Sequence, residues 1–275
     1  MFETLKNVFR VKEMRRKLLY LIWMIFIIRI GCQIPVPGVD SDFFKQWFSS
    51  NAGDAFNFFD AFTGGSFERM SIFALNITPY ITSSIIIQLL TIAIPALEEM
   101  QRDGEEGRKK MTAITRYVTV GLALFESIAM AIGFGRQGMI PNLDFFKGVV
   151  VVACLTAGSA MLMWLGERIT EKGVGNGISI VLTINIISRV PSDLTLLYEN
   201  FIKGKTIAKG TLAGLIIAAV ILLVVVLVLI LNGAERRIPV QYSKKMVGRK
   251  LMGGQSTNIP LKVNTAGVIP IIFSS

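Results

Sequence analysis

Histidine is absent from this sequence of 275 residues. Histidine-based acid–base catalysis and histidine metal ligation are therefore excluded for the chain. Cysteine is scarce: Cys32 and Cys154 lie far apart, in or beside apolar runs. This placement favours a packing role over a disulfide or a metal site. The residues form no recognisable catalytic cluster, so we predict a protein that is not an enzyme and that needs neither a metal nor a cofactor.

Apolar residues, by contrast, are abundant. Hydrophobic residues make up 52% of the chain, and the mean hydropathy is +0.57. A disordered chain is excluded by this composition, and an ordinary soluble domain does not fit it. Several apolar runs reach about 20 residues, the length that crosses a hydrocarbon core. The sequence therefore predicts a polytopic membrane protein, whose first apolar run we interpret as an uncleaved helix.

The spans are expected to be helices, because a helix satisfies its backbone groups within the membrane. This favours an all-α transmembrane bundle. The apolar stretches cover residues 18–35, 71–94, 117–134, 148–165, 177–190, 211–231 and a last one that begins near 265.

Basic residues predict the orientation of these spans. Segments 1–17, 95–116, 166–176 and 232–263 hold 20 Lys and Arg, whereas the alternate segments 36–70, 135–147 and 191–210 hold 7. Because positive loops stay in the cytoplasm, we expect a cytoplasmic N-terminus. The mixed loop 96–116 is expected to fold as a surface hairpin.

Two segments do not suit a simple lipid-facing bundle. Residues 55–65, "AFNFFDAFTGG", are too short to span and too apolar for a solvated loop. They fit either an interfacial helix or a re-entrant piece in a protein-lined cavity. Residues 71–94 carry Asn76 and several hydroxyl groups at membrane depth. Arg29 and Glu126 also lie at this depth and are given no role.

Five blocks then resemble a known family. They are "RIGCQIPVPGVD" (29–40), "SIFALNITPYITSSIIIQLL" (71–90), "EEGRKKMTAITRY" (105–117), "LMWLGERITEKGVGNGISI" (162–180) and "QSTNIPLKVNTAGVIPIIF" (255–273). The sequence resembles the SecY family, the channel-forming subunits of the bacterial protein translocase. The resemblance implies ten spanning helices in two inverted halves, of which this sequence holds the first half and a truncated second.

The resemblance also implies a division of the chain. Residues 1–17 would be a cytosolic segment, and residues 18–190 the first five-helix half, with a plug at about 57–69. Residues 211–275 would hold the sixth helix, a basic cytosolic loop at 232–263 and the start of the seventh helix. At rest, we expect the plug to pack beneath Ile77 and Ile81.

Site residues are carried over from the family's motifs. Ile77 and Ile81 are four residues apart, as are Ile178 and Leu182, so each pair shares a helix face. The implied pore ring is Ile77, Ile81, Ile178, Leu182 and Ile272. The implied plug residues are Asn57, Phe58, Phe59, Gly64, Gly65, Ser66 and Phe67. The implied lateral-gate residues are Thr82, Ser83 and Gln88. The implied docking residues for a ribosome or the SecA motor are Arg236, Arg237, Lys244, Lys245, Arg249 and Lys250.

The resemblance implies a central subunit of a protein-conducting channel in the bacterial cytoplasmic membrane. It would translocate unfolded secretory polypeptides and insert membrane proteins. The implied partners are SecE, SecG, the SecA ATPase, the ribosome, signal sequences, nascent polypeptides and membrane lipids. A polytopic secondary transporter is the alternative, since it also uses proline-broken helices and internal repeats. An intramembrane enzyme would need a catalytic dyad, which we do not find.

Overall fold

The computed structural model describes residues 11–51, 60–138, 140, 144–203, 207–240, 245–247, 250–252 and 257–265. The chain divides into two compact units, Met1–Ser192 and Asp193–Ser275.

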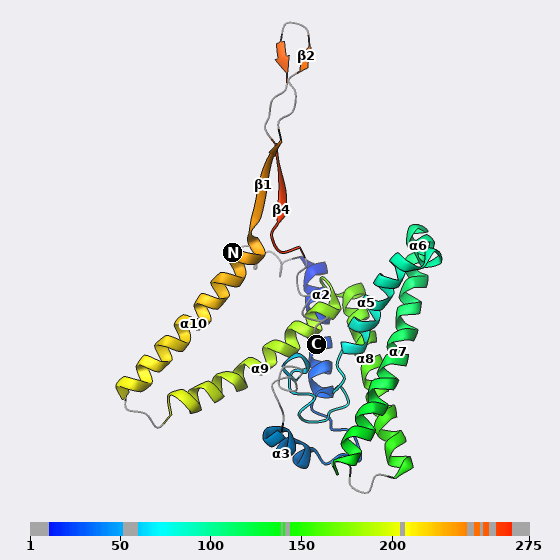
Figure 1. Cartoon of the computed structure of the whole chain (residues 1–275), viewed down its shortest axis with the longest axis vertical. Helices are drawn as coiled ribbons and strands as arrows, with labels where there is room; N and C mark the ends of the chain where they lie inside the picture. The colour runs from blue at the N-terminus through cyan, green and yellow to red at the C-terminus, as the bar shows by residue number, and fades with distance from the viewer. Residues whose placement is uncertain are drawn as a thin grey trace. The chain divides into compact units, whose positions relative to one another are not determined.

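The first unit is a bundle of helices. In Figure 1, α7 and α8 run side by side, and α5 also packs against α7. Its described residues form the helices α2 (Lys12–Gly31), α3 (Ser41–Asn51), α5 (Thr78–Ala93), α6 (Pro95–Arg102), α7 (Gly104–Arg136), α8 (Phe145–Lys172) and α9 (Gly177–Phe201), the last of which runs on into the second unit.

Small residues explain how α7 fits into the bundle. Its buried positions between Thr115 and Ala131 recur every four residues, and all of them are Thr, Ala or Ser. Small side chains allow helix backbones to approach closely in a membrane. Ser127 also lies 2.8 Å (Oγ to Oγ1) from Thr156 of α8, which links the two helices. The buried stripe of α7 therefore combines close packing with polar contacts.

The second span begins later than the sequence predicted. Residues 72–77 form turns, and α5 starts at Thr78, with Pro79 in its first helical turn. Proline suits this position because the first N–H groups of a helix have no partner within the helix. Asn76 has a φ of 52°, which is incompatible with a right-handed helix at this position. The expected helix from residue 71 is therefore wrong for its first seven residues.

Two further boundaries differ from the predictions. The fifth span, expected at 177–190, continues through Pro191 to Phe201 as α9. A proline inside a helix removes one backbone hydrogen bond and can bend the helix without ending it. The loop 96–116 is helical: α6 is bent by 103° from α5 and packs against the start of α7. This arrangement is the helical form of the expected surface hairpin.

Membrane-spanning length is met by several helices. Within the described residues, α7, α8, α9 and residues Lys209–Gly233 of α10 are long and apolar enough to cross a membrane. The bent pair α5 and α6 makes a fifth if it counts as one span. The protein is therefore a multi-pass, predominantly helical membrane protein.

The second unit contains α10 (Ile207–Gly233) and two small antiparallel sheets. Strand β1 (Glu235–Val240) pairs with β4 (Thr257–Lys262), so that Ile238 lies opposite Ile259. Strand β2 (Lys245–Val247) pairs with β3 (Lys250–Met252). The basic loop expected at 232–263 thus contains strands, as the arrows in Figure 1 show.

Candidate functional site

Three of the predicted ring residues meet in one apolar cluster. Ile77 is fully buried, and Ile81 and Ile178 pack against the same cluster while remaining partly buried. We call this group the gasket cluster. Its buried members are Met24, Ile28, Cys32, Phe73, Ile77, Leu162, Leu165, Ile169 and Val181. Residues from α2, α8 and α9 therefore converge with the turn before α5.

The other two predicted ring residues do not join this cluster. Leu182 is half-buried on α9 and lies outside the gasket cluster. Ile272 lies outside the described residues. The cluster also differs from the expectation at Ile77, which precedes the first turn of α5. Its carbonyl accepts the backbone N–H groups of Tyr80 and Ile81, both at 3.0 Å, so Ile77 still shares the helix face of Ile81.

The predicted plug is described from Asp60 onward, and Asn57, Phe58 and Phe59 lie outside the described residues. Residues 60–63 form one turn of helix, which ends at Gly64 and Gly65 with φ values of 68° and 81°. Glycine adopts such angles at little cost. A Cβ on Gly64 would lie 2.7 Å from the Asn185 carbonyl oxygen, so the turn also approaches α9 closely.

The sequence predicted that the plug packs beneath Ile77 and Ile81, whereas the described Phe67 belongs to a different apolar cluster from Ile77. Phe67 is buried in a separate aromatic cluster, 5.8 Å from Phe44, 5.9 Å from Phe48 and 6.0 Å from Phe134, measured between ring centroids. Phe44 and Phe48 come from the amphipathic α3, and Phe134 comes from α7. Aromatic rings prefer such tilted contacts, and α3 supplies the partners that a sequence reading did not assign.

Buried polar groups surround the plug turn. Asp60 is fully buried and forms an ion pair with Arg189 of α9. Its Oδ1 atom accepts the backbone N–H of Glu68 at 2.9 Å. Asn76 donates from Nδ2 to the carbonyl oxygen of Phe62 at 2.9 Å. These contacts hold both ends of the turn by directional bonds, which buried polar groups require.

A second set of contacts runs from Asn76 to α2. Asn185 of α9 donates from Nδ2 to Asn76 Oδ1 at 2.9 Å, and the Arg29 guanidinium donates to Asn185 Oδ1. The Ser159 hydroxyl of α8 donates to the Asn76 carbonyl at 3.2 Å. Arg29 therefore has a structural partner, which the sequence did not reveal. Its position at membrane depth was the signal that could have pointed to a buried network.

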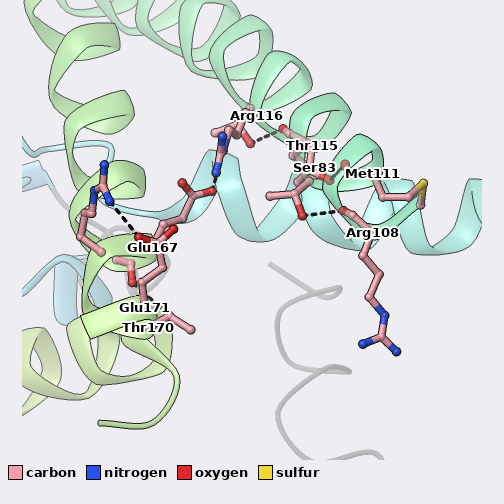
Figure 2. Close-up of polar contacts among 12 residues, drawn as sticks. Ser83, Arg108, Met111, Thr115, Arg116, Glu167, Thr170 and Glu171 are labelled. Atoms are coloured by element: carbon pink, nitrogen blue, oxygen red, sulfur yellow. Dashed lines mark hydrogen bonds and ion pairs between the residues drawn. The ribbon is translucent and has the colours of Figure 1, made fainter. Parts of the chain in front are cut away.

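The predicted gate residues on α5 face different surroundings. Ser83 is buried and donates to the Thr115 carbonyl of α7 at 2.9 Å, as Figure 2 shows. Ser83 thus packs against α7 instead of facing an open groove. Thr82 donates to the Thr78 carbonyl of its own helix at 3.1 Å. Gln88 is exposed.

Beside the gasket cluster lies a hollow of about 460 Å³, lined by residues that include Tyr80, Arg116, Glu167 and Ile178. An ion pair joins Arg116 Nε to Glu167 Oε1 at 2.8 Å and ties α7 to α8 (Figure 2). Ile178 belongs to both the hollow and the gasket cluster. The apolar cluster is therefore bordered by a polar recess.

A family model decides the assignment. The model described as SecY matches residues 71–275 of this chain. The chain belongs to the SecY family.

Similar proteins agree with this membership. The chain is 44% identical to the protein translocase subunit SecY of Halalkalibacterium halodurans over 282 residues, covering all of this chain and 64% of that relative. It therefore spans less than two thirds of the length of that SecY relative.

Solved structures share the fold. One, described as a protein-conducting channel, has a TM-score of 0.58 at 19% identity and covers 94% of this chain and 55% of that chain. Another concerns a SecY plug domain described as stabilising the closed state of the translocation channel. It has a TM-score of 0.55 at 19% identity, with the same coverage of 94% and 55%. At 19% identity, the structural similarity supports a SecY-type fold but does not assign roles to individual residues.

The predicted docking residues that the structure describes lie on strands. Arg236 and Arg237 lie side by side on β1 and are exposed. Lys245 begins β2 and Lys250 begins β3. Lys244 and Arg249 lie outside the described residues. Ile238 and Val240 alternate with other residue types, a pattern that is typical of a strand. The prediction for this loop used only its charges and therefore missed the strand.

No group of three or more His, Cys, Asp or Glu that could hold a metal occurs in the part of the chain that the structure describes.

Proposed function

We propose that this chain forms the central part of a protein-conducting channel in the bacterial cytoplasmic membrane. The channel translocates unfolded secretory polypeptides and inserts membrane proteins. The observation that carries the proposal is the gasket cluster, in which Ile77, Ile81 and Ile178 meet beside a segment held by buried polar contacts. Membership of the SecY family gives this arrangement its functional setting.

Aliphatic side chains suit a seal that must also open. A narrow ring of isoleucines excludes ions because water leaves an apolar constriction. The same ring adapts to any passing chain, since it makes no directional bonds to it. Ile81 and Ile178 remain partly buried, so their side chains can contact a polypeptide that enters. Leu182 and Ile272 stay predictions for the same ring.

The plug segment, residues 57–69, is proposed to close the channel on one side of this ring. Its described part packs on α3, α7 and α9 through Phe67 and Asp60. Gly64 and Gly65 give the turn its conformation. Thr82 and Gln88 remain candidates for a lateral gate, whereas the contact from Ser83 to α7 favours a packing role.

The basic strand-containing loop is proposed to dock a ribosome or the SecA motor from the cytoplasm. Exposed Arg236 and Arg237 would suit RNA phosphates or an acidic protein surface. We further propose SecE and SecG as membrane partners, signal sequences and nascent polypeptides as ligands, and a cytoplasmic N-terminus from the distribution of basic residues. We propose that the SecA motor or the ribosome supplies the energy for transport and that the chain itself is not an enzyme.

A direct test uses a photo-crosslinking amino acid in place of Ile81 in full-length channels with their partner subunits. An arrested secretory polypeptide should cross-link at Ile81. A matched probe at Ile92, an exposed α5 position, should give little product. A secondary transporter would bind no polypeptide at either position. Equal or absent cross-linking at the two sites would overturn the proposal.

A further inference from the structure

The plug turn touches one face of α9. Asp60 pairs with Arg189, and a Cβ on Gly64 would lie 2.7 Å from the Asn185 carbonyl and 3.0 Å from Ser188 Oγ. Positions 185, 188 and 189 lie three and four residues apart, so they share a helix face. The turn is therefore fitted to α9 by shape as well as by charge.

Asp60 is the centre of this contact. One carboxylate oxygen accepts the Glu68 N–H at 2.9 Å and the Thr63 hydroxyl at 3.2 Å. The other oxygen faces Arg189, whose side chain is 22% exposed, whereas that of Asp60 is 0% exposed. A fully buried carboxylate is costly unless it is paired and hydrogen-bonded. The fold of the turn and its attachment to α9 thus depend on the same side chain.

Asn185 provides the second attachment. It donates to Asn76 Oδ1, and Asn76 in turn donates to the Phe62 carbonyl within the turn. Arg29 donates to the oxygen of the same Asn185 amide. Asn185 and Asn76 are both buried. Breaking this series of hydrogen bonds therefore leaves buried polar atoms with neither a protein partner nor water.

The same face of α9 also carries Ile178, which packs against the gasket cluster. Positions 178, 182, 185 and 189 follow a spacing of four, three and four residues. At 3.6 residues per turn, positions 178 and 189 differ in direction by only about 20°. Ile178 packs against the gasket cluster, and Arg189 binds Asp60. A rigid movement of this face therefore affects both groups.

We propose that Asp60, Arg189, Asn185 and Asn76 form a polar latch that couples the plug turn to the gasket through α9. A displacement of α9 that separates Ile178 from Ile77 also withdraws Arg189 and Asn185 from the turn. The seal and the plug then open together. This inference rests on the proposed channel function for its consequence, but the latch itself is a property of the resting fold.

Hydrogen–deuterium exchange of full-length channels in nanodiscs tests the latch without any transport assay. Arg189→Gln should raise exchange across residues 60–70 by at least about tenfold, because it leaves a buried carboxylate unpaired. Exchange in α8 should not change. Arg116→Gln is the matched control, since it breaks the ion pair between α7 and α8 outside the latch. Unchanged exchange across residues 60–70 in Arg189→Gln would overturn the latch.

A double variant separates pairing from general damage. Asp60→Asn keeps an acceptor for the Glu68 N–H and removes the charge. Combined with Arg189→Gln, it should show less exchange than Arg189→Gln alone, because no buried charge is left unpaired. Independent sites would instead give effects that add. Additive effects would show that the two residues do not act as a pair, and would overturn the latch.

Adding a synthetic signal peptide to the unaltered channel tests the coupling. The proposal predicts higher exchange across residues 60–70 when the peptide binds. If Arg189→Gln loosens the turn but the peptide does not, the latch stands and the coupling to channel opening is overturned. If the peptide loosens the turn but Arg189→Gln does not, the channel function is supported and the latch fails.

Discussion

The gasket cluster and the polar latch contain neighbouring residues of the chain but are stabilised by different kinds of interaction. Ile77 belongs to the first and Asn76 to the second. The gasket is built from aliphatic contacts, which are weak individually and tolerate changes of shape. The latch is built from buried hydrogen bonds and one ion pair, which depend on geometry and fail when one partner is lost. We therefore expect the gasket cluster to tolerate changes of shape, and the latch to open when one of its partners is lost.

The largest effect should come from removing one charge of the latch. Arg189→Gln is expected to destabilise the fold by about 3–5 kcal/mol, because Asp60 would be left as an uncompensated buried carboxylate. Thermal unfolding in detergent, followed by circular dichroism, measures this change. A loss no greater than that of an exposed ion pair would contradict the assignment of Asp60 as buried and paired.

Removing a hydrogen-bonding group from the latch should have a smaller effect. Asn185→Leu keeps a similar size but leaves Asn76 and Arg29 without their partner. We expect a loss of about 1–3 kcal/mol, the cost of buried polar groups that lose their hydrogen bonds. The same unfolding measurement applies. Stabilisation by this apolar substitution would mean that the network contributes nothing to the resting fold.

A change of shape in the gasket should be tolerated better than either latch variant. Ile77→Leu conserves volume and apolar character, so we expect a cost below about 1.5 kcal/mol. Comparing its unfolding temperature with that of Asn185→Leu tests the contrast directly. If Ile77→Leu were the more damaging of the two, the gasket would be a rigid core instead of an adaptable seal.

The smallest effect should come from the ion pair between α7 and α8. The side chain of Arg116 is 48% exposed, so water screens much of its attraction to Glu167. Arg116→Gln should therefore cost about 0–1 kcal/mol. Its unfolding temperature provides the baseline for the three other variants.

Much of the bundle could be predicted from the sequence, because apolar run length and basic loops reflect the membrane directly. The spans around residues 117–134, 148–165 and 211–231 lie within α7, α8 and α10. Helix ends were less predictable. The turn before Thr78 depends on Asn76, whose partners Phe62 and Asn185 are distant in the chain.

Part of the candidate site could be predicted, but only through the resemblance to the SecY family. Ile77, Ile81 and Ile178 were expected together and lie in one cluster. The latch was not predictable, since nothing local pairs Asp60 with Arg189 across 129 positions. The neighbours of Phe67 were not predictable for the same reason: Phe44 and Phe134 come from separate helices.

The resting ion conductance of full-length channels in planar bilayers tests the central claim most directly. The claim is that the gasket cluster seals the pore. Ile81→Asp should wet the constriction and raise the conductance well above that of the unaltered channel, because a charge holds water in an apolar ring. Ile92→Asp, at an exposed position of α5 outside the cluster, should raise it less. Unchanged conductance in Ile81→Asp would contradict the account.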